Sequence, residues 1–192
     1  MNVVHRSDSE LAVAARAGDQ AAFASIMQRH KHWLYPFIRR YVADRDDAYD
    51  VLQESFVSAW GALGRYDPER PLQAWLRRIA LNKCRDRARR NAVRRAAVQL
   101  LSVAGFTAEP ASPQELGRSA GALQRLEAAI AALPRTLKEP LVLTQLEGMS
   151  HREAAEFLGL NAKAVETRIY RAKKRLAATL HPSDLADLIG SQ

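Results

Sequence analysis

The sequence predicts an all-α protein of two small helical domains joined by a flexible linker, the C-terminal domain containing a helix-turn-helix. Three observations lead to this prediction. Ala, Leu and Arg, which favour helix, recur through the 192 residues, whereas the chain has only nine glycines. Apolar side chains repeat every three to four residues, as on the buried face of a helix. A stretch rich in Gly and Pro separates two such regions, as a linker does.

The N-terminal domain, residues 1–95, is expected to contain four helices. Asp8 or Ser9 would cap a short first helix, and the pair Gly18-Asp19 would end it and cap the next. That second helix carries a broad apolar stripe, formed by Phe23, Ile26, Met27, Leu34, Phe37 and Ile38. The stripe would pack against the remaining helices of the domain.

Asp46 or Asp47 would cap the third helix, whose apolar side is formed by Leu52, Phe56, Ala59 and Leu63. Residues 64–71 contain Gly and two Pro, so they are expected to form a loop. The fourth helix would begin near Leu72 and run to Arg90 or beyond. Its buried side would be formed by Leu76, Ala80 and Cys84.

Residues 96–121 are expected to form the linker, with one helical turn near residues 98–103. The C-terminal domain, residues 122–192, begins with a helix that buries Leu123, Leu126, Ile130 and Leu133. Pro140 would stand in the first turn of the next helix, where its missing N–H has the least effect.

Residues 150–176 follow a helix-turn-helix pattern. Ser150 and Glu153 form a capping box, Gly159 would end the first helix, and Asn161 would cap the second. The apolar stripe of the second helix is formed by Val165, Ile169, Ala172 and Leu176. Its opposite side is rich in hydrogen-bond donors and consists of Lys163, Glu166, Thr167, Tyr170, Arg171 and Lys174. Residues 162–176 contain six Lys or Arg and one acid. This excess of positive charge favours a helix that enters the major groove of DNA, and it disfavours the alternative of a helical hairpin exposed only to solvent.

The third helix carries an acidic face, which is unexpected in a basic protein. Opposite its apolar side lie Asp50, Gln53, Glu54 and Val57. Paired carboxylates can bind a divalent cation, but no Gly-rich loop or His accompanies them here. Two interpretations remain open, a solvated surface and a docking surface for a basic protein partner.

The fourth helix is strongly basic, with nine Lys or Arg and one acid between residues 77 and 95. The side opposite its apolar face is formed by Trp75, Arg78, Asn82, Arg85, Asp86 and Arg89. Basic side chains supply phosphate contacts, while Asn82 and Asp86, one turn apart, could read base edges. Tyr66 and Trp75 beside the loop could stack on bases that leave the duplex, or could pack in the core.

The formal net charge of +8 and the sequence pI near 10.1 favour an anionic partner, either nucleic acid or an acidic membrane surface. The single cysteine excludes an internal disulfide and a multi-cysteine zinc site. The five histidines lack metal-ligand spacing, so a metal-dependent nuclease is disfavoured and no cofactor is expected. Neither an 18-residue apolar run nor the apolar core of a signal peptide is found, which predicts a soluble, intracellular protein without membrane insertion.

Four segments with characteristic spacing follow one another along the chain: residues 47–56, 75–90, 133–160 and 165–176. They are similar to the patterns DAEDLxQExF, WLxRIAxNxxxDxxRR, LPxxxREPLxLxxxEGxSxxEAAxxLGL and VxxRxxRAxxRL. Each is weak alone, but in this order they resemble bacterial RNA polymerase sigma factors of the extracytoplasmic-function (ECF) group. Tyr49 and Lys138 depart from the family pattern, which has an acid and an Arg there, and Asn161 replaces the usual Ser or Thr.

The resemblance implies a non-enzymatic initiation factor of the cytoplasm that binds core RNA polymerase, promoter DNA and an anti-sigma protein. Residues 1–95 would be the sigma region 2 domain, and residues 122–192 the region 4 domain. A basic coiled coil of the largest polymerase subunit would contact Asp50, Gln53 and Glu54. The −10 element would be contacted by Tyr66, Trp75, Asn82, Arg85, Asp86 and Arg89. The −35 element would be contacted by Lys163, Glu166, Thr167, Tyr170, Arg171 and Lys174.

The alternative function is that of a free-standing helix-turn-helix regulator, which binds operators without polymerase. Such a regulator would need a ligand pocket or a dimer surface in its N-terminal domain in place of the acidic docking face. The acidic face therefore distinguishes the two functions.

Overall fold

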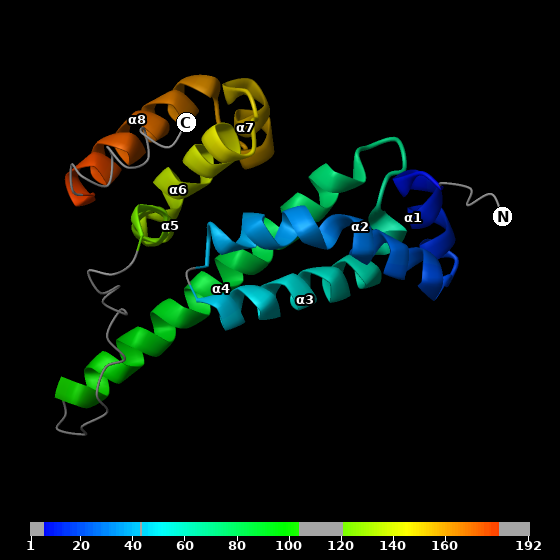
Figure 1. The fold of residues 1–192 in the computed structure, drawn as a ribbon, viewed down its shortest axis with the longest axis horizontal. Helices are drawn as coiled ribbons and strands as arrows, with labels where there is room; N and C mark the ends of the chain where they lie inside the picture. Colours follow the sequence, from blue (N-terminus) through cyan, green and yellow to red (C-terminus); the bar gives the residue numbers. More distant parts are fainter. Residues whose placement is uncertain (1–5, 43, 104–120, 181–192) are drawn as a thin grey trace. The chain divides into compact units, whose positions relative to one another are not determined.

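The structure, a computed structural model, describes residues 6–42, 44–103 and 121–180 (Figure 1). These residues form helices and turns, with no strand among them, so the all-α prediction is confirmed. The chain divides into two compact units, Met1–Pro110 and Ala111–Gln192. This division agrees with the predicted pair of helical domains.

The first unit consists of α1 (Asp8–Arg16), α2 (Gln20–Arg39), α3 (Arg45–Ala62), the 3₁₀ turn η1 (Leu63–Arg65) and α4 (Leu72–Val103). Helix α3 packs against both α2 and α4, and α1 packs against α2. Helices α3 and α4 run antiparallel because η1 and a short loop join them (Figure 1). The largest fully buried side chains of this unit are Ile26, Leu34, Phe37, Ile38, Val51, Leu76 and Leu81.

Two predicted helix caps are wrong by one to three residues. The N-cap of α1 is Ser7, whose hydroxyl accepts from the backbone N–H of Glu10 while the Glu10 carboxylate accepts from the N–H of Ser7. The N-cap of α3 is Asp44, which accepts from the N–H of Asp47. The neighbouring acids Asp46 and Asp47 therefore fall in the first turn, where they complement the helix dipole. The predicted cap of α2, Asp19, is confirmed.

The predicted apolar stripe of α2 is buried except at one position. Met27 is 38% exposed. The predicted apolar sides of α3 and α4 are buried at all their positions. Trp60, at the edge of the α3 stripe, remains 37% exposed and makes an edge contact with Phe23 at 5.0 Å between ring centroids.

Helix α4 runs beyond Arg90, as the prediction allowed, and includes the helical turn predicted near residues 98–103. It continues without interruption to Val103, so the first eight residues of the expected linker, 96–103, are helical. No Gly or Pro interrupts residues 72–103, and Ala, Leu and Arg favour continuation of the helix. The rest of the expected linker up to residue 120 lies outside the described residues.

The second unit consists of α5 (Ala122–Ala132), α6 (Arg135–Leu141), the π-helical turn η2 (Val142–Leu146), α7 (His151–Leu158) and α8 (Ala162–Thr179). Pro140 lies in the last turn of α6, not in a first turn as predicted. Pro has no N–H to donate to the preceding turn, and the backbone changes from α to π geometry two residues later, at Val142. The hydroxyl of Thr144 donates to the carbonyl of Pro140 at 2.8 Å.

The helix-turn-helix is formed by α7 and α8 as predicted. Ser150 and Glu153 make the reciprocal capping box, and Asn161 accepts from the N–H of Ala164. Gly159 has φ +68° between the helices, in the left-handed region that L side chains rarely adopt. The stripe of α8 packs inward, with Val165, Ile169 and Ala172 buried.

Candidate functional site

The acidic face of α3 borders a groove on the first unit. The groove is open, has a volume of about 400 Å³, and is lined by Asp50, Gln53, Glu54, Val57, Ser58 and Lys83. All three residues predicted to dock the polymerase therefore line one groove. Val57 is 72% exposed and Tyr49, on the same helix, is 56% exposed, so apolar and acidic side chains lie together on this surface.

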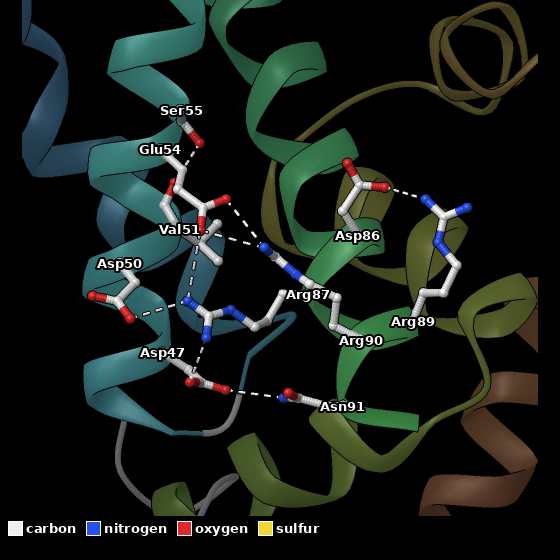
Figure 2. Close-up of polar contacts among 10 residues, drawn as sticks. All are labelled: Asp47, Asp50, Val51, Glu54, Ser55, Asp86, Arg87, Arg89, Arg90 and Asn91. Atoms are coloured by element: carbon white, nitrogen blue, oxygen red, sulfur yellow. Dashed lines mark hydrogen bonds and ion pairs between the residues drawn. The ribbon is translucent and has the colours of Figure 1, made fainter. Parts of the chain in front are cut away.

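The carboxylates of this face are also bound by α4 (Figure 2). The Arg87 guanidinium lies 2.9 Å from Asp47 Oδ1 and 3.0 Å from Asp50 Oδ2, and 3.8 Å from Glu54 Oε1. Arg90 Nη2 lies 3.2 Å from Glu54 Oε2. The sequence left open a solvated surface and a docking surface for a basic protein partner. In the structure the acidic face also has a partner within the chain along one side.

Arg87 was not among the predicted site residues, although the sequence contains a signal for it. The buried stripe of α4, Leu76, Ala80 and Cys84, continues at helical spacing to Arg87 and Asn91. The core side of α4 thus changes from apolar to polar toward the C-terminus, where it meets the acids of α3. Asn91 Nδ2 donates to Asp47 Oδ2 at 2.9 Å, which continues the same contact.

The opposite side of α4 carries the side chains predicted to contact the −10 element. Asn82 and Arg89 are exposed, and Arg85 and Asp86 are half-buried. Arg85 donates to Asn82 Oδ1 at 3.1 Å, and Arg89 is paired with Asp86, on the side of α4 away from Arg87 (Figure 2). The structure brings these four side chains together on one surface as predicted.

The two aromatic residues of the predicted −10 surface are less accessible than expected. Tyr66 is only 5% exposed, and its hydroxyl donates to the carbonyl of Arg70 at 2.7 Å. Burial raises the pKa of the Tyr66 phenol above its usual value. Trp75 is half-buried, with its ring centroid 5.1 Å from that of Tyr66. In this structure Tyr66 is a core residue that holds the loop, so it offers no free ring face for a base.

The outer side of α8 is exposed at the residues predicted to contact the −35 element, except that Thr167 is half-buried. Lys163 Nζ lies 3.0 Å from Glu166 Oε2, and this bond lowers the pKa of the Glu166 carboxyl. The Thr167 hydroxyl donates to the carbonyl of Lys163 at 2.8 Å. Tyr170 is 69% exposed between Glu166 and Lys174, so a large aromatic ring projects from the centre of the surface.

Within the described ranges, no group of three or more His, Cys, Asp or Glu side chains is arranged to hold a metal ion. No helix among the same residues is long and apolar enough to cross a membrane.

Comparison with known proteins identifies two matching family profiles. Residues 26–94 match the profile described as Sigma-70 region 2, and residues 123–176 match the profile described as Sigma-70, region 4. The first match covers the helices that carry the groove and the −10 surface. The second covers α5 to α8 up to Leu176, including the helix-turn-helix.

Several curated proteins are similar along nearly their whole length. RNA polymerase sigma factor CnrH of Cupriavidus metallidurans is 41% identical over 91% of this chain and 94% of its own. RNA polymerase sigma factor NccH of Alcaligenes xylosoxydans xylosoxydans is 36% identical over 93% of this chain and 97% of its own. ECF RNA polymerase sigma factor SigM of Mycobacterium tuberculosis is 33% identical over 91% of this chain and 85% of its own. The solved structure of CnrH in complex with the cytosolic domain of CnrY has a TM-score of 0.60 at 38% identity, covering 89% of this chain and 95% of that one.

Proposed function

Because this chain belongs to the ECF group of RNA polymerase sigma factors, we propose that its acidic groove docks core RNA polymerase and that α4 and α8 read promoter DNA. As a member of this family, the protein binds core polymerase and directs promoter-specific transcription initiation. A free-standing operator-binding regulator is not favoured, since the region 2 match includes the acidic helix.

The observation that carries the docking proposal is the groove on α3 and α4. Asp50, Gln53 and Glu54 line it together, and the neighbouring Val57 offers exposed apolar surface. A basic partner helix would meet opposite charge beside an apolar contact, and such complementarity steers association and fixes orientation. The three residues are therefore proposed as the centre of the polymerase contact.

For the −10 element, we assign base contacts to Asn82 and Asp86, and phosphate contacts to Arg85 and Arg89. The support is their shared surface on α4 and the pairing that already orients Asn82 and Asp86. Trp75 is the aromatic residue of this surface that remains partly exposed. Tyr66 is assigned a supporting role, because its buried ring packs beneath Trp75 and its hydroxyl holds the loop.

For the −35 element, we assign the major-groove contacts to the exposed side of α8. Glu166, Thr167, Tyr170 and Arg171 would contact base edges, and Lys163 and Lys174 would contact phosphates. The support is the position of α8 as second helix of a helix-turn-helix, with its apolar stripe packed inward.

Three further features of the proposal follow from the family. The protein is inferred to have no catalytic activity of its own and to act in the cytoplasm. An anti-sigma protein is inferred as its regulator, since the related CnrH was solved with the cytosolic domain of CnrY. Such a regulator would block either the groove or the DNA-binding side of α8.

The docking proposal is tested with the double variant Asp50→Asn, Glu54→Gln. The two substitutions remove the charges but keep the shapes, and Arg87 retains Asp47 as a partner at 2.9 Å. We expect the variant to fold, but to bind purified core polymerase at least about tenfold more weakly, since lost charge complementarity at an interface costs a few kcal/mol. Binding is measured by titration of labelled full-length protein with core enzyme.

A matched control removes two exposed acids elsewhere, with the substitutions Glu127→Gln and Glu156→Gln on α5 and α7. This control has the same net charge as the test variant and is expected to bind polymerase normally. Equal binding by the test variant and the control would overturn the docking assignment.

A further inference from the structure

Arg87 occupies a special position among the basic side chains of α4. Its side chain is only 17% exposed, whereas the Arg89 and Arg90 side chains are 75% and 56% exposed. Its two terminal nitrogens contact carboxylates at three positions of α3, 47, 50 and 54, as Figure 2 shows for the whole cluster. A largely buried guanidinium directed at three acids is poorly placed to bind a DNA phosphate.

The three acids of α3 would repel one another without this cation. They lie three and four residues apart, so they project from one side of the helix. The planar fork of Arg87 binds Asp47 with Nη1 and Asp50 with Nη2, and so fixes both side chains relative to the backbone of α4. Lys cannot reproduce this geometry, because its ammonium is a single point charge.

The contacts of Arg87 leave the outer part of Asp50 free. Arg87 binds only Oδ2 of that carboxylate, and the Asp50 side chain remains 60% exposed beside the groove. One oxygen is thus held from behind, while the other can accept a hydrogen bond from a partner. Holding a binding group in place before association reduces the entropy lost on binding.

We propose that Arg87 is a positioning residue for polymerase docking, acting through Asp50 and Glu54 rather than by contact with polymerase or DNA. Arg90 also holds Glu54, donating to its two oxygens at 3.3 and 3.2 Å. Arg87 is the residue whose guanidinium reaches all three acids. The inference rests on the proposed role of the groove. It adds that the full affinity of the groove for polymerase requires a specific arginine behind it.

The experiment is a double-mutant cycle on the full chain, read out as the Kd for purified core polymerase. Arg87→Ala is measured in the native sequence and in the Asp50→Asn, Glu54→Gln background. We expect Arg87→Ala to raise Kd roughly tenfold in the native sequence. In the neutralised background the increase should be less than about twofold, because the effects of residues in direct contact are not additive. Arg87→Lys is expected to restore only part of the lost affinity.

Arg94→Ala is the matched control, since it removes one exposed positive charge from the same helix. It should change Kd by less than about twofold in both backgrounds if charge alone has little effect. Thermal unfolding of each variant checks the fold, and Arg87→Lys replaces Arg87→Ala throughout the cycle if the latter does not fold.

The outcomes separate the two proposals. If Asp50→Asn, Glu54→Gln leaves Kd unchanged, the docking role of the groove fails. If that variant binds weakly but Arg87→Ala binds normally, or weakens both backgrounds equally, the groove is retained and the positioning role of Arg87 is overturned.

Discussion

His30 is a buried histidine of α2 that contacts one hydrogen-bond donor, Trp33, and one acceptor, Asp8 of α1. The indole N–H of Trp33 donates to His30 Nδ1 at 2.9 Å, and Asp8 Oδ2 lies 2.9 Å from Nε2. Because an indole N–H can only donate, Nδ1 must be unprotonated, so the proton of the neutral ring is on Nε2. The folded environment therefore suits the neutral imidazole.

This environment makes stability depend on pH. Burial lowers the pKa of His30 below its usual value of 6.5, against the opposing effect of Asp8, while His32 and Arg29 lower it further. Below pH 6.5 the unfolded chain takes up a proton at His30 that the folded chain resists, so the free energy of unfolding decreases as the pH falls. In urea unfolding, the His30→Gln variant should lose less free energy of unfolding between pH 7.5 and pH 5.5 than the native protein does. His32→Gln removes a smaller contribution to the same pKa shift, so it should reduce the loss less than His30→Gln does, and an unchanged loss in His30→Gln would contradict the assignment.

Arg171 and Lys174 on α8 allow base reading to be separated from phosphate binding, since both are exposed. Arg171→Ala should lower discrimination between −35 variants by about 1–3 kcal/mol if the guanidinium makes a bidentate contact with guanine. Lys174→Ala should weaken initiation from all variants alike. The measurement is in vitro transcription with core polymerase from a set of −35 variants. A uniform effect of both substitutions would assign Arg171 to the phosphates as well.

At the scale of helices, the sequence was most informative where a local hydrogen bond defines the helix end. Ser150, Gly159 and Asn161 were predicted from their spacing and occupy those caps, since each cap depends only on neighbouring residues. The cap of α3 was missed because three acids, Asp44, Asp46 and Asp47, stand close together and any of them could cap a helix. To identify which of these acids is the N-cap, one must know at which residue the chain turns into the helix.

The turn between α7 and α8 depends on the backbone of Gly159. A Cβ added there would meet nothing within 4 Å, so the cost of Gly159→Ala comes from its φ of +68° alone. We expect a loss of about 1–2 kcal/mol in the free energy of unfolding of the second unit, the usual cost of the left-handed region. Gly61→Ala is the matched control, because Gly61 lies in α3 with equally open space and negative φ. That control should stabilise its helix by about 0.5–1 kcal/mol, and chemical denaturation of both variants checks the opposite signs.

At the scale of the whole molecule, pairing between helices was the part that the sequence could not provide. Periodicity shows which side of α3 or α4 is apolar, but not that the two helices run side by side. The nine basic residues between 77 and 95 were therefore counted together as support for DNA binding. In the structure, Arg87 is committed to acids of α3, and Arg77 lies over the rings of Trp33 and Phe37 at 5.3 and 5.9 Å. The partners of Arg87 and Arg77 are far from them in sequence, so these contacts could not be predicted from local patterns.

The charge of the whole chain predicts how the protein binds DNA without polymerase. The net charge is +8, and the residues 162–176 contribute six basic side chains. If all six lie close enough to the duplex to displace counterions, affinity for a −35 duplex falls roughly a thousandfold between 50 and 200 mM salt. Fluorescence anisotropy with the full-length protein provides the measurement. Affinity independent of salt, or no binding at low salt, would contradict the assignment of α8 to DNA.

The two opposite sides of α4 restrict how this region of the gene can change in length. The side chains assigned to DNA and those that contact α3 alternate over residues 82–91, and both depend on the rotation of one continuous helix. A single inserted codon would rotate everything after it by about 100°. The Arg87 side chain would then no longer contact the acids of α3, and the Arg89 side chain would no longer lie on the side of α4 assigned to DNA. Deletions and insertions in this stretch should therefore be eliminated by selection.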